Sequence, residues 1–164
     1  MKGKKLIFLT LALLLPVAIF IFLKLFGRNE FNVPPMHQEG SIETPVNCNF
    51  TYKAPYHVPD SVIASLHLTK PDSLYVLYFD PALITAMNRV SVEFKWSPVN
   101  VVAPSSFSRE TNVRILKECV LLMQPPASVT LIDHKNRIRG YYDGSDRDEV
   151  DRLIVEMKII LKKY

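Results

Sequence analysis

The sequence predicts an α/β domain preceded by one N-terminal transmembrane helix. The chain opens with a long apolar run behind several lysines, and its middle alternates short apolar segments with helical patterns. It closes with a hairpin pattern followed by an amphipathic helix. These observations divide the chain into a membrane anchor with basic flanks over residues 1–28, a Pro-rich linker over 29–59 and a folded domain over 60–164.

The predicted anchor is the apolar run Leu6–Leu23, which only Thr10 and Pro16 interrupt. A helix over this run is roughly 27 Å long, close to the hydrocarbon thickness of a bilayer. Lysines precede the run and no acidic residue occurs before Glu30, which places the N-terminus in the cytoplasm. A cleaved signal peptide is the alternative, but the run is long for one and no small-residue cleavage site follows. We therefore expect an uncleaved, single-pass anchor.

Charge is unevenly distributed along the chain. The net charge is +4, yet residues 1–28 hold five Lys or Arg and no acidic residue. The remainder is close to neutral, so it lacks the concentrated basic face that nucleic-acid binding requires. Residues 29–59 contain five prolines and no helical periodicity, which predicts an extended linker.

The middle of the predicted domain alternates helices and strands. Leu74–Phe79 is a continuous apolar and aromatic run, typical of a central strand that is covered on both faces. Asp80 is expected to cap a helix over Pro81–Phe94, with proline at the first helical position. The other predicted elements are a short helix, a strand, a helix and a short strand or helix end, at Asp60–Leu68, Val99–Ala103, Ser108–Glu118 and Val120–Met123.

The last part of the chain predicts a β-hairpin and a helix. Ser128–Ile132 and Ile138–Tyr142 are the two strands, joined by polar turn residues at 134–137. Ser145 is expected to cap the final helix, with Asp148 at capping-box spacing. The apolar stripe of that helix comprises Val150, Leu153, Ile154, Met157, Ile160 and Leu161. The order strand, helix, strand, helix, hairpin, helix indicates a thioredoxin-like domain.

The segment LIDHKNRIRGYYDGSDRDEVDRLI resembles the C-terminal part of the Sco/SenC family. These proteins are membrane-anchored copper chaperones of thioredoxin-like fold that assist cytochrome c oxidase assembly. The resemblance covers the last third of the chain and is looser back to about Asn47. It implies a bacterial inner-membrane protein with its domain in the periplasm. It also implies copper ligands at two places, a Cys-x-x-x-Cys after the first strand and a histidine before the hairpin.

This chain lacks those ligands at the expected positions. Where the family has its cysteines, the sequence reads Asp80, Pro81, Ala82 and Leu83, and where it has its histidine, Pro125 and Pro126. Soft Cu(I) prefers thiolate, thioether and imidazole ligands. We therefore expect no metal and no other cofactor. No nucleophile–base pattern or phosphate-binding loop points to another reaction, so the chain is not expected to be an enzyme.

Two cysteines remain, Cys48 and Cys119. A disulfide between them would close a loop of about seventy residues and stabilise the fold by about 4 kcal/mol. The alternative is two unrelated thiols, with Cys119 acting as a small buried hydrophobe. His37 and His57 flank Cys48, but their spacing matches no metal motif.

Three functions follow from these patterns. The first is a membrane-anchored, extracytoplasmic and non-catalytic binding or assembly factor for a respiratory oxidase. Its partners would be the membrane and a respiratory membrane complex, without nucleic acid. The second is a copper or thiol-redox chaperone that uses Cys48 and Cys119, and the third is an accessory subunit of a membrane complex. The missing copper ligands favour the first.

Overall fold

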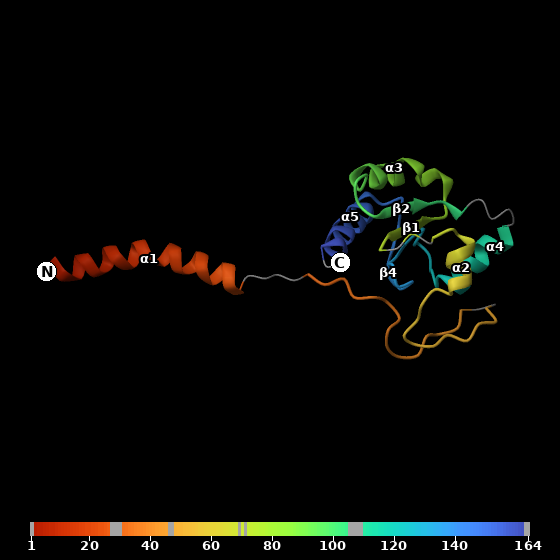
Figure 1. The fold of residues 1–164 in the computed structure, drawn as a ribbon, viewed down its shortest axis with the longest axis horizontal. Helices are drawn as coiled ribbons and strands as arrows, with labels where there is room; N and C mark the ends of the chain where they lie inside the picture. Colours follow the sequence, from red (N-terminus) through yellow and green to blue (C-terminus); the bar gives the residue numbers. More distant parts are fainter. Residues whose placement is uncertain are drawn as a thin grey trace. The chain divides into compact units, whose positions relative to one another are not determined.

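The computed structural model describes residues 2–26, 31–45, 48–68, 70, 72–104 and 110–162. The chain divides into two compact units, Met1–Asn32 and Val33–Tyr164, and each is considered by itself. The first unit contains helix α1 (Lys2–Phe26), and the second contains the sheet and the remaining helices (Figure 1).

The predicted membrane anchor over Leu6–Leu23 is wrong. In the part of the chain that the structure describes, none of the helices combines the length and the apolar character that a membrane crossing needs. A run of about eighteen residues lies at the short end of what a bilayer requires, and α1 also contains Pro16 and carries Lys24 in its last turn. The transmembrane part of the predicted fold class is therefore withdrawn. So are the single-pass topology, the inner-membrane location and the periplasmic placement.

The second unit is a small α/β domain built on a four-stranded mixed sheet in the order β2-β1-β3-β4. Strand β1 (Leu74–Tyr78) runs parallel to β2 (Val99–Val102) and antiparallel to β3 (Val129–Ile132). Strand β4 (Ile138–Tyr142) pairs antiparallel with β3. The predictions of a central strand near residue 74 and of a C-terminal hairpin are confirmed.

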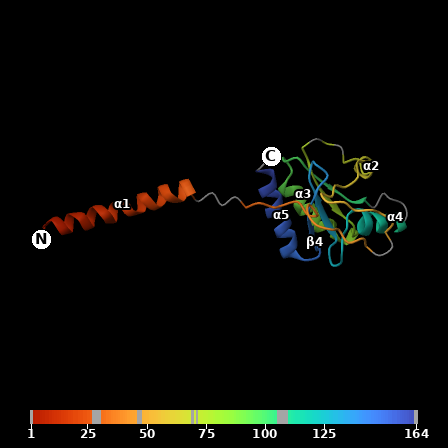
Figure 2. The ribbon, with the colours of Figure 1, turned by 90° about the horizontal axis from the view of Figure 1, so that it is seen from below.

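Helices cover both faces of the sheet and produce three layers. On one face lie α3 (Ile84–Glu93) and α5 (Arg147–Leu161), whose apolar side chains share one core. On the other face lie α2 (Asp60–Ser65) and the π-helix η3 (Ile115–Val120), which share a second core. Figures 1 and 2 show α3 and α5 together on one side, with α4 (Glu110–Arg114) on the other.

The apolar run of β1 supplies both cores. Leu74 and Val76 enter the core beneath α3 and α5, whereas Tyr75 and Leu77 enter the core beneath α2 and η3. Successive side chains of a strand point to opposite faces, so a strand between two helical layers has to be apolar at every position. This requirement explains why LYVLY shows no polar alternation.

Two helix predictions are corrected in detail. The helix expected over Ser108–Glu118 is α4 followed directly by the π-helix, and Ser108 lies outside the described residues. The N-cap of α5 is Asp146 and not Ser145, because the Asp146 carboxylate accepts the hydrogen bond from the amide of Asp148 at 2.9 Å. The hydroxyl of Ser145 instead donates to the carboxylate of Asp143 at 2.6 Å.

The segment predicted as a linker packs against the domain. We call residues 33–58 the strap; within it, residues 46 and 47 are not described. The amide of Met36 donates to the carbonyl of Ile138 in β4 at 2.8 Å, and the amide of Val58 donates to the carbonyl of Asn136 at 2.8 Å. The prolines of the strap remove backbone donors at their own positions only, so Met36 and Val58 keep the amides that bind the hairpin.

Candidate functional site

The strand–helix junction is where the sequence placed a degenerate active site. Asp80 ends the segment after β1, and its carboxylate accepts a hydrogen bond from the amide of Ala82 at 2.9 Å. Pro81, Ala82 and Leu83 form the 3-10 turn η1 (Pro81–Leu83) that leads into α3, and Leu83 is buried in the core. The structure thus brings these four residues together as a capped helix start.

The cavity at this junction is small. Its volume is about 150 Å³, and its lining comprises Tyr78, Phe79, Asp80, Pro81, Ile84 and Ala103. Binding pockets for small molecules usually measure about 300–1,000 Å³. Pro125, which the sequence grouped with this junction, is not part of that lining and borders a different cavity. Pro125 and Pro126 are joined by a cis peptide bond before β3.

The two cysteines meet elsewhere in the fold. Cys48 of the strap and Cys119 of η3 form a disulfide with their Cα atoms 5.5 Å apart. Both are buried, with 8% and 5% of their surfaces exposed. Of the two alternatives considered for these residues, the structure contains the disulfide. Neither sulfur lies at the start of a helix.

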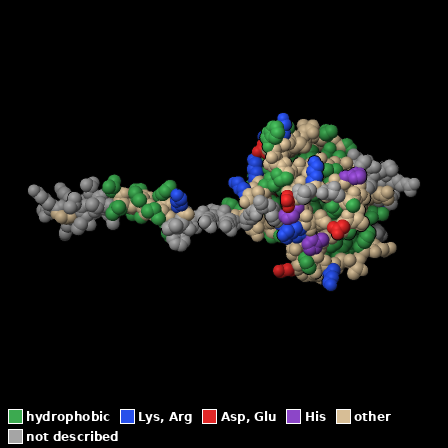
Figure 3. Space-filling model, in the orientation of Figure 1, with side chains coloured by type: hydrophobic (Ala, Val, Ile, Leu, Met, Phe, Trp, Pro, Cys, Tyr) green, Lys and Arg blue, Asp and Glu red, His purple; other side chains and the backbone are tan. Residues whose placement is uncertain are grey.

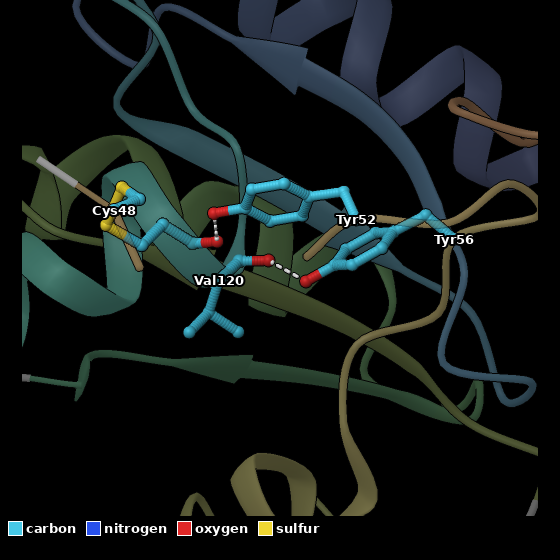
Figure 4. Close-up of a disulfide and its surroundings, with 5 residues drawn as sticks. Cys48, Tyr52, Tyr56 and Val120 are labelled. Atoms are coloured by element: carbon cyan, nitrogen blue, oxygen red, sulfur yellow. Dashed lines mark hydrogen bonds between the residues drawn. A yellow bond between two sulfur atoms is a disulfide. The ribbon is translucent and has the colours of Figure 1, made fainter. Parts of the chain in front are cut away.

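Three tyrosines bind the backbone at and just after Cys119, and we call Tyr52, Tyr56 and Tyr141 the tyrosine clamp. The hydroxyl of Tyr52 donates to the carbonyl of Cys119 at 2.7 Å, and that of Tyr56 donates to the carbonyl of Val120 at 2.7 Å (Figure 4). The hydroxyl of Tyr141 donates to the next carbonyl, that of Leu121, at 2.6 Å. The last carbonyls of a helix lack partners within it, so the clamp satisfies three successive acceptors.

The clamp closes an unusual helix end. The amide of Leu121 donates to the carbonyl of Leu116 at 2.8 Å, five residues back, as expected of a π-turn. Leu122 then adopts a left-handed backbone with φ of 54°, a conformation that is uncommon for a leucine. Such π-turns occur frequently at functional sites. Sequence reasoning missed the clamp, although Tyr52 and Tyr56 follow Cys48 closely in the strap.

A large cavity lies between the strap and the end of η3, and we call it the strap cavity. Its volume is about 740 Å³, within the usual range of ligand sites. The described residues that line it are His37, Ser41, Ile42, Glu43, Thr44, Pro45, Glu118, Leu122, Gln124 and Pro125. Two of these are acidic and none is Lys or Arg, so the cavity favours cationic ligands.

The protonation states in this region are set by burial and by hydrogen bonds. The Nε2 atom of His37 lies 3.0 Å from the hydroxyl oxygen of Tyr141. The Tyr141 hydroxyl donates its hydrogen bond to the carbonyl of Leu121, so toward His37 it acts as an acceptor. The Nε2 atom of His37 therefore carries the hydrogen, which fixes the tautomer of the ring. Burial lowers the pKa of His37 and favours the neutral ring. Burial, with the nearby Tyr52, raises the pKa of Tyr56 to about 12 and keeps its hydroxyl a donor.

In the described part of the chain, two other histidines and the surface charges show no sign of a metal site. His57 and His67 are exposed. Among the residues described, His, Cys, Asp and Glu form no group of three or more that could hold a metal ion. On the face shown in Figure 3, basic, acidic and histidine side chains are interspersed with apolar ones.

Comparison with known proteins gives no relative: the chain matches no family model, no curated protein and no solved structure. Nothing in these comparisons identifies a Sco/SenC protein or links the chain to cytochrome c oxidase assembly. The likeness of the C-terminal segment to that family stays an untested resemblance. The descriptions drawn from it, a membrane protein that assists oxidase assembly, are withdrawn.

Proposed function

We propose that the unit Val33–Tyr164 is a non-catalytic binding domain that holds a basic segment of a polypeptide partner in the strap cavity. The observation that carries this proposal is that the two cysteines are joined to each other. Cys48 and Cys119 are buried in a disulfide. The strand–helix junction, where the sequence pointed to a degenerate active site, is occupied by the hydrogen-bonded cap of Asp80 and Ala82. The disulfide then serves to fix the strap that forms one wall of the cavity.

Thiol-redox chemistry is the alternative, and the position of Cys119 argues against it. Reactive cysteines are found where a helix N-terminus or a cation stabilises the thiolate. Cys119 is the second-last residue of η3, near the end of a helix where partial negative charge disfavours a thiolate. The carbonyl of Cys119 is also engaged by Tyr52. Both features suit a structural bond.

The chemistry of the strap cavity indicates the ligand. Glu43 comes from the strap and Glu118 from η3, so two carboxylates from separate segments line one space. Serine, threonine and glutamine side chains supply further hydrogen-bonding groups. Apolar side chains and His37 make up the rest of the lining, so a ligand here combines charge pairing with apolar contact. This combination suits lysine or arginine side chains of a polypeptide, whose methylene stems are apolar.

The test of the proposal is a titration of the labelled full chain with a defined lysine-rich peptide, in which the NMR chemical shifts of the protein are recorded. We expect saturable shifts at strap residues that weaken several-fold in Glu43→Gln and in Glu118→Gln. Glu39→Gln is the matched control, because Glu39 is an exposed strap residue outside the cavity lining. Equal weakening by all three substitutions would mean non-specific attraction and would refute the site.

The proposed lack of copper-transfer and thiol-redox activity is tested separately. A Cu(I) competition titration and a disulfide-reductase assay on the oxidised protein are expected to show neither stoichiometric copper binding nor turnover. Thiol-dependent Cu(I) binding that Cys119→Ser abolishes would instead support the chaperone alternative.

A further inference from the structure

The single tryptophan of the chain, Trp96, is the most exposed large apolar residue among those described in the α/β unit. It is 90% exposed, on the turn between α3 and β2. Tryptophan has the largest apolar surface of any side chain and is highly buried on average. An indole left in water on a folded domain is therefore a candidate contact residue, since Trp is enriched at binding hot spots.

The turn that carries Trp96 is held by backbone hydrogen bonds. The amide of Ser97 donates to the carbonyl of Phe94 at 3.0 Å, and the amide of Leu74 in β1 donates to the carbonyl of Pro98 at 2.8 Å. Phe94 is itself buried in the core beneath α3. The indole is thus presented by an ordered turn, which lowers the entropic cost of binding a partner.

Trp96 borders a second large cavity, distinct from the strap cavity, and we call it the tryptophan cavity. Its volume is about 640 Å³. Four parts of the fold meet there: the approach to β1, the turn after α3, the hairpin turn and the end of α5. The described lining residues are Asp72, Leu74, Trp96, Ser97, Pro98, His134 and Leu161.

The hairpin wall of this cavity is also fixed. Buried Asp133 accepts hydrogen bonds from the amide of Lys135 at 2.9 Å and from that of Arg137 at 3.0 Å. These two bonds bracket His134 and set the path of the turn that carries it. The tryptophan cavity therefore has ordered walls on two sides.

The negative charge in the described lining of this cavity favours a cationic ligand. Asp72 is acidic, and the described lining contains no Lys or Arg. The indole face adds to the attraction, because an aromatic ring presents negative potential to cations. The ammonium of Lys95 already lies 5.1 Å from the ring centroid, so a ligand cation has to displace it or use the opposite face of the indole.

We propose that the tryptophan cavity binds the guanidinium of an arginine side chain on a polypeptide partner. The planar guanidinium stacks on the indole of Trp96 and pairs with the carboxylate of Asp72, while its methylene stem packs on Pro98 and Leu161. Arginine is favoured over lysine because the guanidinium stacks on aromatic faces and pairs bidentately with carboxylates. This proposal stands apart from the strap cavity, with which it shares no lining residue.

The indole supplies the readout, because the full chain contains one tryptophan. Three blocked tripeptides, Gly-Arg-Gly, Gly-Lys-Gly and Gly-citrulline-Gly, are titrated while tryptophan fluorescence is recorded. We expect a saturable change with the arginine peptide and a Kd on the order of 1 mM, the range that a ligand of side-chain size reaches. The lysine peptide should bind several-fold more weakly, and the uncharged citrulline peptide should produce no saturable change. Equal responses to arginine and citrulline would overturn the proposal.

Substitutions show which cavity binds the arginine peptide. Asp72→Asn should weaken the arginine peptide by about three- to tenfold, the range of a partly exposed charged pair. Glu39→Gln is the matched control and should leave this titration unchanged, because Glu39 is exposed and lines neither cavity. Glu43→Gln is measured beside it to report on the strap cavity. Circular dichroism checks that each variant is folded. An arginine affinity that Asp72→Asn leaves intact would refute the assignment, and loss with Glu43→Gln alone would move the binding to the strap cavity.

Discussion

Removal of the Cys48–Cys119 disulfide should destabilise the domain by about 4 kcal/mol. The two residues are separated by 71 positions, and closing a loop of that size in the unfolded chain removes about 15 cal/mol/K of entropy in the chain-entropy model. At 298 K this corresponds to about 4.4 kcal/mol. The loss approaches the whole stability of many small domains, which is about 5–15 kcal/mol.

The double variant Cys48→Ala, Cys119→Ala is the suitable perturbation, because both positions are buried and a serine would place a hydroxyl there. Urea unfolding followed by circular dichroism gives the free energy of unfolding of the oxidised protein, the reduced protein and the variant. Reduction should lower the stability of the natural chain to that of the variant and leave the variant unchanged. A loss below about 1 kcal/mol on both routes would refute the entropic argument.

Three further predictions concern single groups. Asp133→Asn should cost about 3–5 kcal/mol in urea unfolding, because it leaves the guanidinium of Arg139, 6% exposed, without its carboxylate; an unchanged midpoint would contradict this. The raised pKa of Tyr56, about 12, favours its neutral form in the folded state, so about 2 kcal/mol of stability should be lost as pH rises from 10 to 12. Tyr56→Phe should abolish that part of the pH dependence, as measured by unfolding at fixed pH values. Gly144→Ala should destabilise by about 1–3 kcal/mol, because the new Cβ would lie 2.6 Å from Cδ1 of Leu83; a thermal midpoint equal to that of the natural chain would argue against this crowding.

The parts of the fold that the sequence predicts correctly are those set by local patterns. The run Leu74–Phe79 has the apolar continuity of a central strand, and β1 is central. Asp80 and Pro81 form the expected helix start, because the cap hydrogen bond spans only two residues. Five of the six stripe residues in α5 are buried, and Leu161 is partly buried.

The strap could not be predicted because its contacts are long-range. His37 and Tyr141, which are in hydrogen-bond contact, are 104 residues apart in the chain. Proline content alone suggested an extended linker, and the strap is indeed without regular helix or strand among its described residues. Its binding to the hairpin depends on backbone amides, which every sequence contains, so composition gives no signal for it.

The strap cavity and the tryptophan cavity could not be predicted from the sequence for the same reason. Glu43 and Glu118 are far apart in the chain and line one cavity only in the folded domain, and neither glutamate belongs to a recognisable motif. The sequence points to Asp80 instead, because the family that the C-terminal segment resembles has its copper-binding cysteines at that junction. The cavity there is about 150 Å³, against about 740 Å³ at the strap.

The hydrogen bond from Met36 to Ile138 has a consequence for how copies of this chain meet. Strand β4 is one edge of the sheet, and an uncovered edge offers its backbone groups to strands of other molecules. Through Met36 the strap occupies an outward-facing carbonyl of that edge. Proteolytic removal of the strap would therefore uncover a hydrogen-bonding edge, and the domain that remained would be prone to pair with itself and aggregate.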